Sequence, residues 1–140
     1  MLECLILGDS IAVGIAQHKK ECVSITRVGI TSHKWYSEFI ENPTYNKKYR
    51  VVVISLSTND FKNMSPHSTE EFLYNIRKRA NAQLVIWILP NPILKPNQHK
   101  VIKELAKEFG DKTLETLNHV GYDSIHPTVE GYKELAKNIK

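Results

Sequence analysis

Nearly unbroken apolar runs alternate with amphipathic helical segments along this chain, and this alternation constrains the fold more than any other feature. Strand-like runs occupy residues 2–7, 22–26, 51–56 and 84–89, and a weaker one covers 113–117. Three of these runs are almost continuously apolar, which is typical of parallel strands that helices cover on both faces. We therefore expect helices between them.

Four further segments place their apolar residues at helical spacing, so that each forms one apolar face. The faces consist of Trp35, Tyr36, Phe39 and Ile40; Phe72, Leu73, Ile76 and Ala80; Val101, Ile102, Leu105, Ala106 and Phe109; and Tyr132, Leu135, Ala136 and Ile139. Ser68 and Glu71 form a capping box that predicts the start of the second of these helices, and Gly110 predicts the end of the third. Another helix is expected over residues 11–19, although Gly14 weakens it.

This order of elements predicts an α/β fold in which a β-α unit repeats five times. Such a chain forms a three-layer α/β/α sandwich around a five-stranded parallel sheet, with right-handed crossovers. A length of 140 residues fits a single domain over 1–140. Ligands of these sheets bind beyond the carboxyl ends of the strands, so the functional residues are expected at that rim.

Charge and composition favour a soluble protein without nucleic-acid or membrane partners. The net charge is +4, but the lysines are spread over several helices, and the cluster Arg77-Lys78-Arg79 falls at a predicted helix end, where cations are stabilising. No apolar stretch is long enough to span a membrane, and the N-terminus lacks the features of a signal peptide. Cys4 and Cys22 lie in apolar runs and are expected to be buried thiols, which suggests a reducing, cytoplasmic location.

Unusual polar residues occur where the predicted strands end. Gly8-Asp9-Ser10 follows the first strand, Gly29 follows the second, and Ser57-Thr58-Asn59-Asp60 follows the third. Asp123-Ser124-Ile125-His126 precedes the last helix. Because the strands are expected to be parallel, all four groups should lie on one rim of the sheet.

Ser10 stands at a tight turn from a strand into a helix, where its hydroxyl projects from the rim and the positive helix end favours an oxyanion. These properties suit a nucleophile. Asp123 is able to hold the imidazole of His126, which would take the proton of Ser10 and return it to a leaving alcohol. Taken singly, Ser10 is more often a helix cap, and the Asp-His pair is more often a structural contact in a loop.

The backbone amides of Gly29 and Ser10 and the side-chain amide of Asn59 are candidate donors for an oxyanion hole. Each residue also has an ordinary structural explanation. Gly29 suits a turn with positive φ, and Asn59 suits a turn in which it bonds its own backbone.

Taken in order, G-D-S-I at 8–11, Gly29, S-T-N-D at 57–60 and D-S-I-H-P at 123–127 resemble the four sequence blocks of the SGNH (GDSL-like) hydrolases. The resemblance spans nearly the whole chain. It implies a flavodoxin-like sheet and ester hydrolysis through an acyl-enzyme, with no metal or organic cofactor. It assigns Ser10, Asp123 and His126 to the triad, and it assigns the amide of Ser10, Gly29 and Asn59 to the oxyanion hole.

One position departs from the family pattern, because Ser57 stands where these hydrolases usually have glycine. Its side chain is expected to narrow the acyl site or to shift the end of the strand. Asp9 and Asp60 flank the proposed catalytic residues and are expected to orient the turns. Metal binding by them is disfavoured, because the sequence has no His-x-x-x-His motif or carboxylate-histidine cluster.

We expect an esterase that hydrolyses short acyl groups, with O-acetyl groups on a carbohydrate as the expected substrate, because a chain this short implies trimmed loops and a shallow site. The expected partner is therefore a small-molecule or carbohydrate ester. Trp35, Tyr36 and Trp87 are able to stack on sugars, but their spacing favours the core. The alternative is a binding or structural module that keeps the fold without turnover. Small proteins of this family occur in bacteria and phages, so association with a virion is the alternative location if the protein is phage-encoded.

Overall fold

The computed structural model describes residues 1–60 and 65–140, which contain one five-stranded parallel sheet. The strands are β1 (Leu2–Gly8), β2 (Val23–Thr26), β3 (Tyr49–Ser55), β4 (Ala82–Leu89) and β5 (Lys112–Glu115). They lie in the order β2-β1-β3-β4-β5, which is the flavodoxin-like order. The sheet expected from the apolar runs is therefore confirmed.

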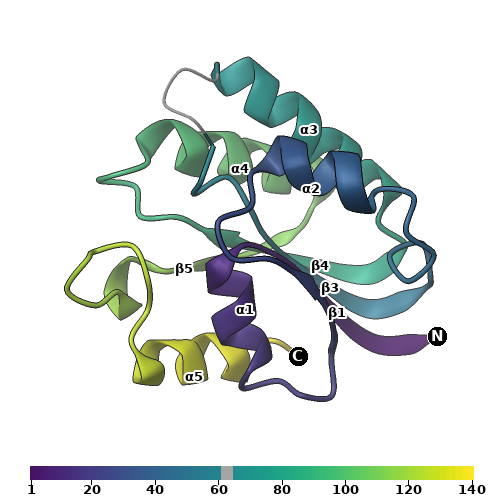
Figure 1. Ribbon diagram of the computed structural model, residues 1–140, viewed down its shortest axis with the longest axis horizontal. Coiled ribbons are helices and arrows are strands. Elements are labelled where there is room, and N and C mark those ends of the chain that lie inside the picture. The colour runs from purple at the N-terminus through teal and green to yellow at the C-terminus, as the bar shows by residue number, and fades with distance from the viewer. Residues whose placement is uncertain (61–64) are drawn as a thin grey trace.

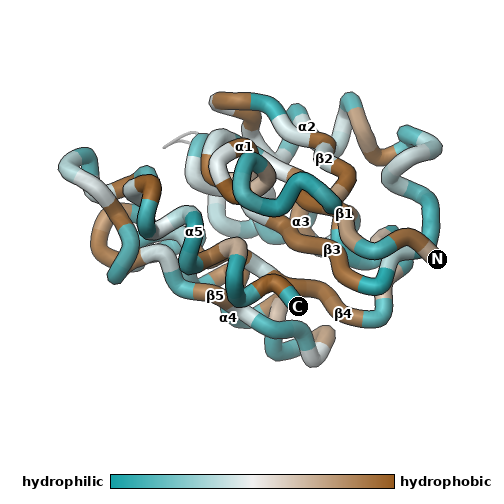
Figure 2. Tube along the Cα trace, turned by 90° about the horizontal axis from the view of Figure 1, so that it is seen from below, coloured by the Kyte–Doolittle hydropathy of each residue, from teal (hydrophilic) through white to brown (hydrophobic). Residues whose placement is uncertain are grey.

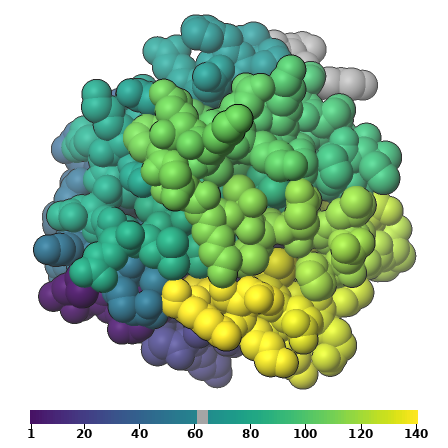
Figure 3. All heavy atoms as spheres, turned by 180° about the vertical axis from the view of Figure 1, so that it is seen from behind, coloured from purple at the N-terminus to yellow at the C-terminus, as the bar shows by residue number. Residues whose placement is uncertain are grey.

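Helices cover both faces of the sheet (Figure 1). They are α1 (Ser10–Ala16), α2 (Ser32–Phe39), α3 (Pro66–Arg79), α4 (Pro96–Phe109) and α5 (Val129–Lys137), with a short 3-10 helix, η1, at Leu117–His119. Helices α1 and α5 pack together on one face, and α2, α3 and α4 cover the other. This arrangement is the predicted three-layer sandwich. Seen from behind, side chains of α4 and of the C-terminal segment cover much of the surface (Figure 3).

The apolar core consists of two clusters, one on each face of the sheet, with the brown central strands between them (Figure 2). Trp35 and Trp87 are completely buried in the larger cluster, and Tyr36 packs against it. These three side chains therefore pack in or against the core, as their spacing favours, and the two tryptophans are closed to a sugar.

Helix α1 is shorter than expected, because it ends at Ala16 instead of continuing to residue 19. Gly14 has a packing role in this helix. A Cβ atom at this position would lie 2.2 Å from the ring of Tyr132 in α5, so only glycine permits the two helices to approach this closely. The residue that weakens the helix is thus the one that brings α5 against it.

The N-terminus of α3 was predicted three residues too late. Ser65 caps the helix, its hydroxyl accepts from the amide of Ser68 at 3.1 Å, and Pro66 occupies the first helical position. Proline fits there because its φ is already helical and the missing amide hydrogen has no helical acceptor. At the end of α4, Gly110 has a φ of 72°, which confirms it as the C-cap.

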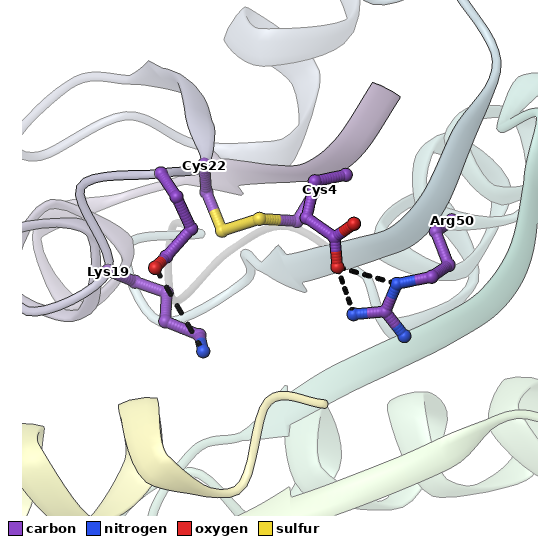
Figure 4. Close-up of a disulfide and its surroundings, with 6 residues drawn as sticks. Cys4, Lys19, Cys22 and Arg50 are labelled. Carbon is purple, nitrogen blue, oxygen red and sulfur yellow. Dashed lines mark hydrogen bonds and ion pairs between the residues drawn. A yellow bond between two sulfur atoms is a disulfide. The ribbon is translucent and has the colours of Figure 1, made fainter. Parts of the chain in front are cut away.

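The expectation of two reduced thiols is wrong, because Cys4 and Cys22 form a disulfide (Figure 4). Leu5 of β1 and Val23 of β2 are neighbours in the parallel register, and the two cysteines precede them with Cα atoms 4.7 Å apart. Since disulfides persist in oxidising compartments, the cysteines no longer support a cytoplasmic location. In the part of the chain that the structure describes, no helix is long and apolar enough to span a membrane.

Candidate active site

The turn from β1 into α1 determines how Ser10 is presented. Gly8 has a φ of 139°, and a Cβ atom there would lie 1.8 Å from the carbonyl oxygen of Ser55, so the turn requires glycine. Asp9 is the N-cap of α1 and accepts from the amide of Ile11 at 3.1 Å. The cap is therefore Asp9, and the hydroxyl of Ser10 is left for another partner.

That partner is His126, which lies 116 residues further along the chain. The Oγ atom of Ser10 is 2.8 Å from Nε2 of His126, and Nδ1 of His126 is 2.7 Å from Oδ2 of Asp123. An ionised carboxylate only accepts hydrogen bonds, so Nδ1 must carry a proton, and in the neutral imidazole Nε2 then accepts from the Ser10 hydroxyl. This is the hydrogen-bond order that a serine nucleophile needs.

The loop between η1 and α5 fixes the positions of Asp123 and His126. The amide of Gly121 donates to the carbonyl of His126 at 2.8 Å, and Val120 and Pro127 form an isolated bridge. Within this closed turn, Ser124 takes a φ of 60°, an uncommon conformation for a residue other than glycine. The loop is therefore held from both ends.

Asp123 is ionised at all moderately acidic and neutral pH values. Its Oδ1 atom accepts from the backbone amides of Ile125 and His126, each at 2.9 Å. The bond to the Ile125 amide, followed by the bond to the imidazole and the second amide, lowers the pKa of Asp123 to about 2. The side chains of Asp123 and His126 remain 38% and 46% exposed, so this part of the site is open to water.

The three expected oxyanion donors come from the loops after β1, β2 and β3. The Nδ2 atom of Asn59 donates to the carbonyl of Ile30 at 3.3 Å, which uses one of its two hydrogens. Gly29 has a φ of 78°. Among the residues that the structure describes, no acceptor is bonded to the backbone amides of Ser10 and Gly29. These amides are free to bind an oxygen of a ligand.

The Asp60 carboxylate connects the loop after β3, which carries Asn59, to helices α2 and α3. It accepts from the amide and the hydroxyl of Ser32 at 2.8 and 3.0 Å, and from the hydroxyl of Thr69 at 2.8 Å. The Asp60 carboxylate thus joins the end of β3 to the start of α2 and to α3. Its expected role of orienting the turn stays a prediction.

Asp9 is completely buried, and its Oδ1 atom also accepts from the hydroxyl of Ser55 at 3.1 Å. Its Oδ2 atom has no partner among the described residues. Burial raises the pKa of Asp9 to about 6, against the lowering effect of its hydrogen bonds. Burial, together with the charges of Asp9 and Asp123, raises the pKa of Tyr132 to about 12.

Ser57, the residue that departs from the family pattern, is completely buried. Its φ is 90°, in the left-handed region that glycine occupies without strain. The hydroxyl has no partner within residues 1–60 and 65–140. The serine at this position is therefore both strained and unsatisfied.

Two surface cavities, of about 570 and 520 Å³, lie away from these residues. The first lies between α4 and β5, and the second lies between the end of α1 and α5. Neither is lined by Ser10, Asn59 or His126. Within the described residues, no group of three or more His, Cys, Asp or Glu side chains is placed to hold a metal ion.

Sequence reasoning missed several exposed apolar residues on the loops around Ser10. Tyr122, directly before Asp123, is fully exposed, and Ile93 and Leu94 are exposed on the loop after β4. A large apolar residue inside an otherwise polar loop, next to a proposed catalytic residue, was the signal that could have identified them.

The strand order and the arrangement of Ser10, His126 and Asp123 define an α/β protein with a serine-histidine-aspartate group at the carboxyl rim of its sheet. No protein-family model matches the sequence, and no curated protein matches it. Solved structures do resemble it, and they show that the chain has the fold of the GDSL-like (SGNH) hydrolases.

One such structure is a GDSL-like lipase from Bacteroides thetaiotaomicron, with a TM-score of 0.71 and 20% identity over 97% of this chain and 84% of that one. Another is the C-terminal catalytic domain of peptidoglycan O-acetyltransferase A from Streptococcus pneumoniae, with a TM-score of 0.65 and 14% identity over 96% and 88% of the two chains. A carbohydrate esterase family 3 protein from Talaromyces cellulolyticus has a TM-score of 0.66 and 12% identity over 97% and 93%.

Proposed function

We propose that this protein is a serine esterase that hydrolyses short acyl esters, with O-acetyl groups on a carbohydrate as its substrate class. The observation that carries the proposal is the continuous hydrogen-bond chain from Ser10 through His126 to Asp123. Its position at the carboxyl rim of a parallel sheet supports the assignment, because ligands of such sheets bind there.

In the proposed reaction, the Ser10 oxygen attacks the ester carbonyl carbon while Nε2 of His126 takes the hydroxyl proton. The carbonyl oxygen becomes an oxyanion, which the amides of Ser10 and Gly29 and the side chain of Asn59 stabilise. The bond to the alkoxy oxygen then breaks, and His126 gives its proton to the leaving alcohol. Water repeats the sequence on the acyl-enzyme, which releases the carboxylic acid and restores Ser10.

The substrate class rests on the openness of the site and on the fold neighbours. With His126 nearly half exposed, the site offers little burial for a long acyl chain, which favours small acyl groups. Among the fold neighbours, one is a carbohydrate esterase and one acts as a peptidoglycan O-acetyltransferase. These two neighbours support a substrate with acyl groups on a carbohydrate, whereas the lipase neighbour supports a substrate with a longer acyl chain.

A fluorophosphonate probe and p-nitrophenyl acetate test this proposal together, because the probe labels only an activated serine. We expect Ser10→Ala to abolish labelling and to lower kcat by about 10⁴-fold or more, with His126→Ala nearly as severe. Ser24→Ala is the matched control, because Ser24 is an exposed serine on β2. The Ser24→Ala protein should keep both the probe labelling and the turnover of p-nitrophenyl acetate.

Two outcomes would contradict the proposal. Turnover that survives in pure Ser10→Ala protein would exclude Ser10 as the nucleophile. Absence of labelling and of turnover in the unaltered protein would favour the alternative, a binding module that keeps the fold without catalysis.

A further inference from the structure

The exposed apolar side chains of this protein are concentrated at one end of the sheet. In the described part of the chain, seven large apolar residues are exposed: Met1, Leu2, Val28, Ile93, Leu94, Tyr122 and Val129. Met1 precedes β1 and Leu2 begins it, at the opposite end of the strand from Ser10. The other five follow the carboxyl ends of β2, β4 and β5, where Ser10 also lies. Exposed apolar groups gathered around a site mark a binding surface.

Tyr122 is the most unusual of the five. Its ring is fully exposed and makes no aromatic or cation-π contact within residues 1–60 and 65–140. The other tyrosines are buried or partly buried. A tyrosine that contributes no packing, one residue before Asp123, has no role in stabilising the fold.

A hydrogen bond ties the Tyr122 loop to the loop that carries Ile93 and Leu94. The Nδ2 atom of Asn91 donates to the carbonyl of Ser124 at 2.8 Å. Figure 1 shows both loops projecting beyond the same end of the sheet, on the left of the view. The three apolar side chains therefore belong to two joined loops.

The chemistry of the proposed reaction determines which part of an ester faces these loops. His126 must return a proton to the leaving alcohol, so the alcohol lies on the His126 side of Ser10. The donors Gly29 and Asn59 come from the loops after β2 and β3. Tyr122 lies on the loop that carries His126, so its loop borders the alcohol side of Ser10, whereas Gly29 and Asn59 lie on other loops.

We propose that Tyr122 is a stacking platform for a sugar ring that carries the ester, with Ile93 and Leu94 as the apolar border of this subsite. The inference rests on the proposed esterase function and specifies its leaving group. A flat, exposed phenol ring matches the C–H face of a pyranose, and the neighbouring Ser124 is an exposed polar residue that suits a ring bearing hydroxyls. An alkyl chain has no hydroxyl that could bond with Ser124.

The test uses xylotetraose and chitotetraose that carry O-acetyl esters. It compares kcat/KM for these two substrates with kcat/KM for ethyl acetate, whose alcohol has no ring. The unaltered protein should prefer at least one acetylated oligosaccharide. Tyr122→Ala should lower that preference about three- to tenfold, mainly by raising KM for the oligosaccharide. Tyr122→Phe and Tyr122→Trp keep an aromatic face and should retain the preference.

Leu2→Ala is the matched control, since Leu2 is exposed and apolar but lies at the other end of the sheet. Leu2→Ala should leave kcat/KM unchanged for the oligosaccharides and for ethyl acetate. Far-ultraviolet circular dichroism and thermal melts of all variants should match the unaltered protein, because Tyr122 is not packed.

Each adverse outcome has a distinct meaning. Failure to hydrolyse ethyl acetate and p-nitrophenyl acetate would refute the esterase function itself. An active enzyme that shows no preference for either oligosaccharide, or whose preference survives Tyr122→Ala, would overturn the stacking role alone. If Tyr122→Ala lowered kcat/KM only for p-nitrophenyl octanoate, Tyr122 would contact the acyl chain. If Tyr122→Phe also lost the preference for the oligosaccharide, the tyrosine hydroxyl and not the ring face would be responsible. Either result overturns the proposal.

Discussion

Removing the disulfide between Cys4 and Cys22 should lower the free energy of unfolding by about 3 kcal/mol. The two cysteines are 18 residues apart. For a loop of that length, the chain-entropy relation gives an unfolded-state constraint of about 3 kcal/mol at 25 °C. The bond also ties β1, which leads to Ser10, to the edge strand β2, which spans only four residues.

The assay is urea unfolding followed by tryptophan fluorescence, with and without reductant, on the unaltered protein and on Cys4→Ala, Cys22→Ala and the double variant. Each single variant breaks the same bond, so each should lose about 3 kcal/mol, and the double variant should lose little more. Reduction should have no effect on any of the three variants. Thiol titration of the unfolded, unreduced protein should find no free thiol.

Lys19→Ala is a control at the same place, because Lys19 pairs with Glu21 beside the disulfide (Figure 4). Loss of this surface pair should cost less than about 1 kcal/mol. The reasoning would be refuted if reduction left the urea midpoint unchanged, or if the two single substitutions were simply additive.

Three further predictions concern the rim. Ser57→Gly should raise the free energy of unfolding by about 1 kcal/mol in urea titrations, because it removes both a strained φ of 90° and an unpaired buried hydroxyl. The greater conformational entropy of glycine in the unfolded chain offsets part of this gain. A destabilised Ser57→Gly protein would exclude strain at this position. For Asp9, the pKa of about 6 in the fold lies above the ordinary 3.8, so its contribution to stability is present below pH 4 and is lost as the pH rises through 6. Asp9→Asn does not titrate at this position, so the stability of the variant relative to the unaltered protein should increase by about 2 kcal/mol between pH 4 and 7, and a constant difference would contradict the raised pKa. Rates on p-nitrophenyl esters should fall from acetate to octanoate, because the open site leaves long chains in water, and a maximum at octanoate would indicate an apolar groove.

The sheet was predictable because its main strands are buried on both faces, so their sequences are continuous apolar runs. Runs such as 51–56 and 84–89 correspond to β3 and β4 within a few residues. The site residues followed from the same logic, because parallel strands bring the ends of β1, β2 and β3 to one rim whatever their separation in the chain. The pairing of Ser10 with His126, whose side chains lie 2.8 Å apart, was expected from the family resemblance, because the strand pattern alone brings only their loops to the same rim.

Apart from the start of α3, which depends on its own first turn, the errors concern features that only the folded structure shows. Cys4 and Cys22 looked like two buried thiols, because only the register of β1 against β2 places them opposite each other. The early end of α1 coincides with the close packing of Tyr132 over Gly14, which the weak helix propensity of glycine does not reveal. Tyr122 was overlooked because exposure is a property of the folded loop.

The adjacent residues Asp9 and Ser10 explain how one turn serves both the fold and the proposed chemistry. Aspartate and serine both cap helices well, so either residue is able to satisfy the first amides of α1. The structure uses the Asp9 carboxylate, which bonds the amide of Ile11 and the hydroxyl of Ser55 and is buried in doing so. The raised pKa of Asp9 is the energetic consequence of that burial. Because Asp9 does the capping, the Ser10 hydroxyl is not bound to its own helix and is free to meet His126.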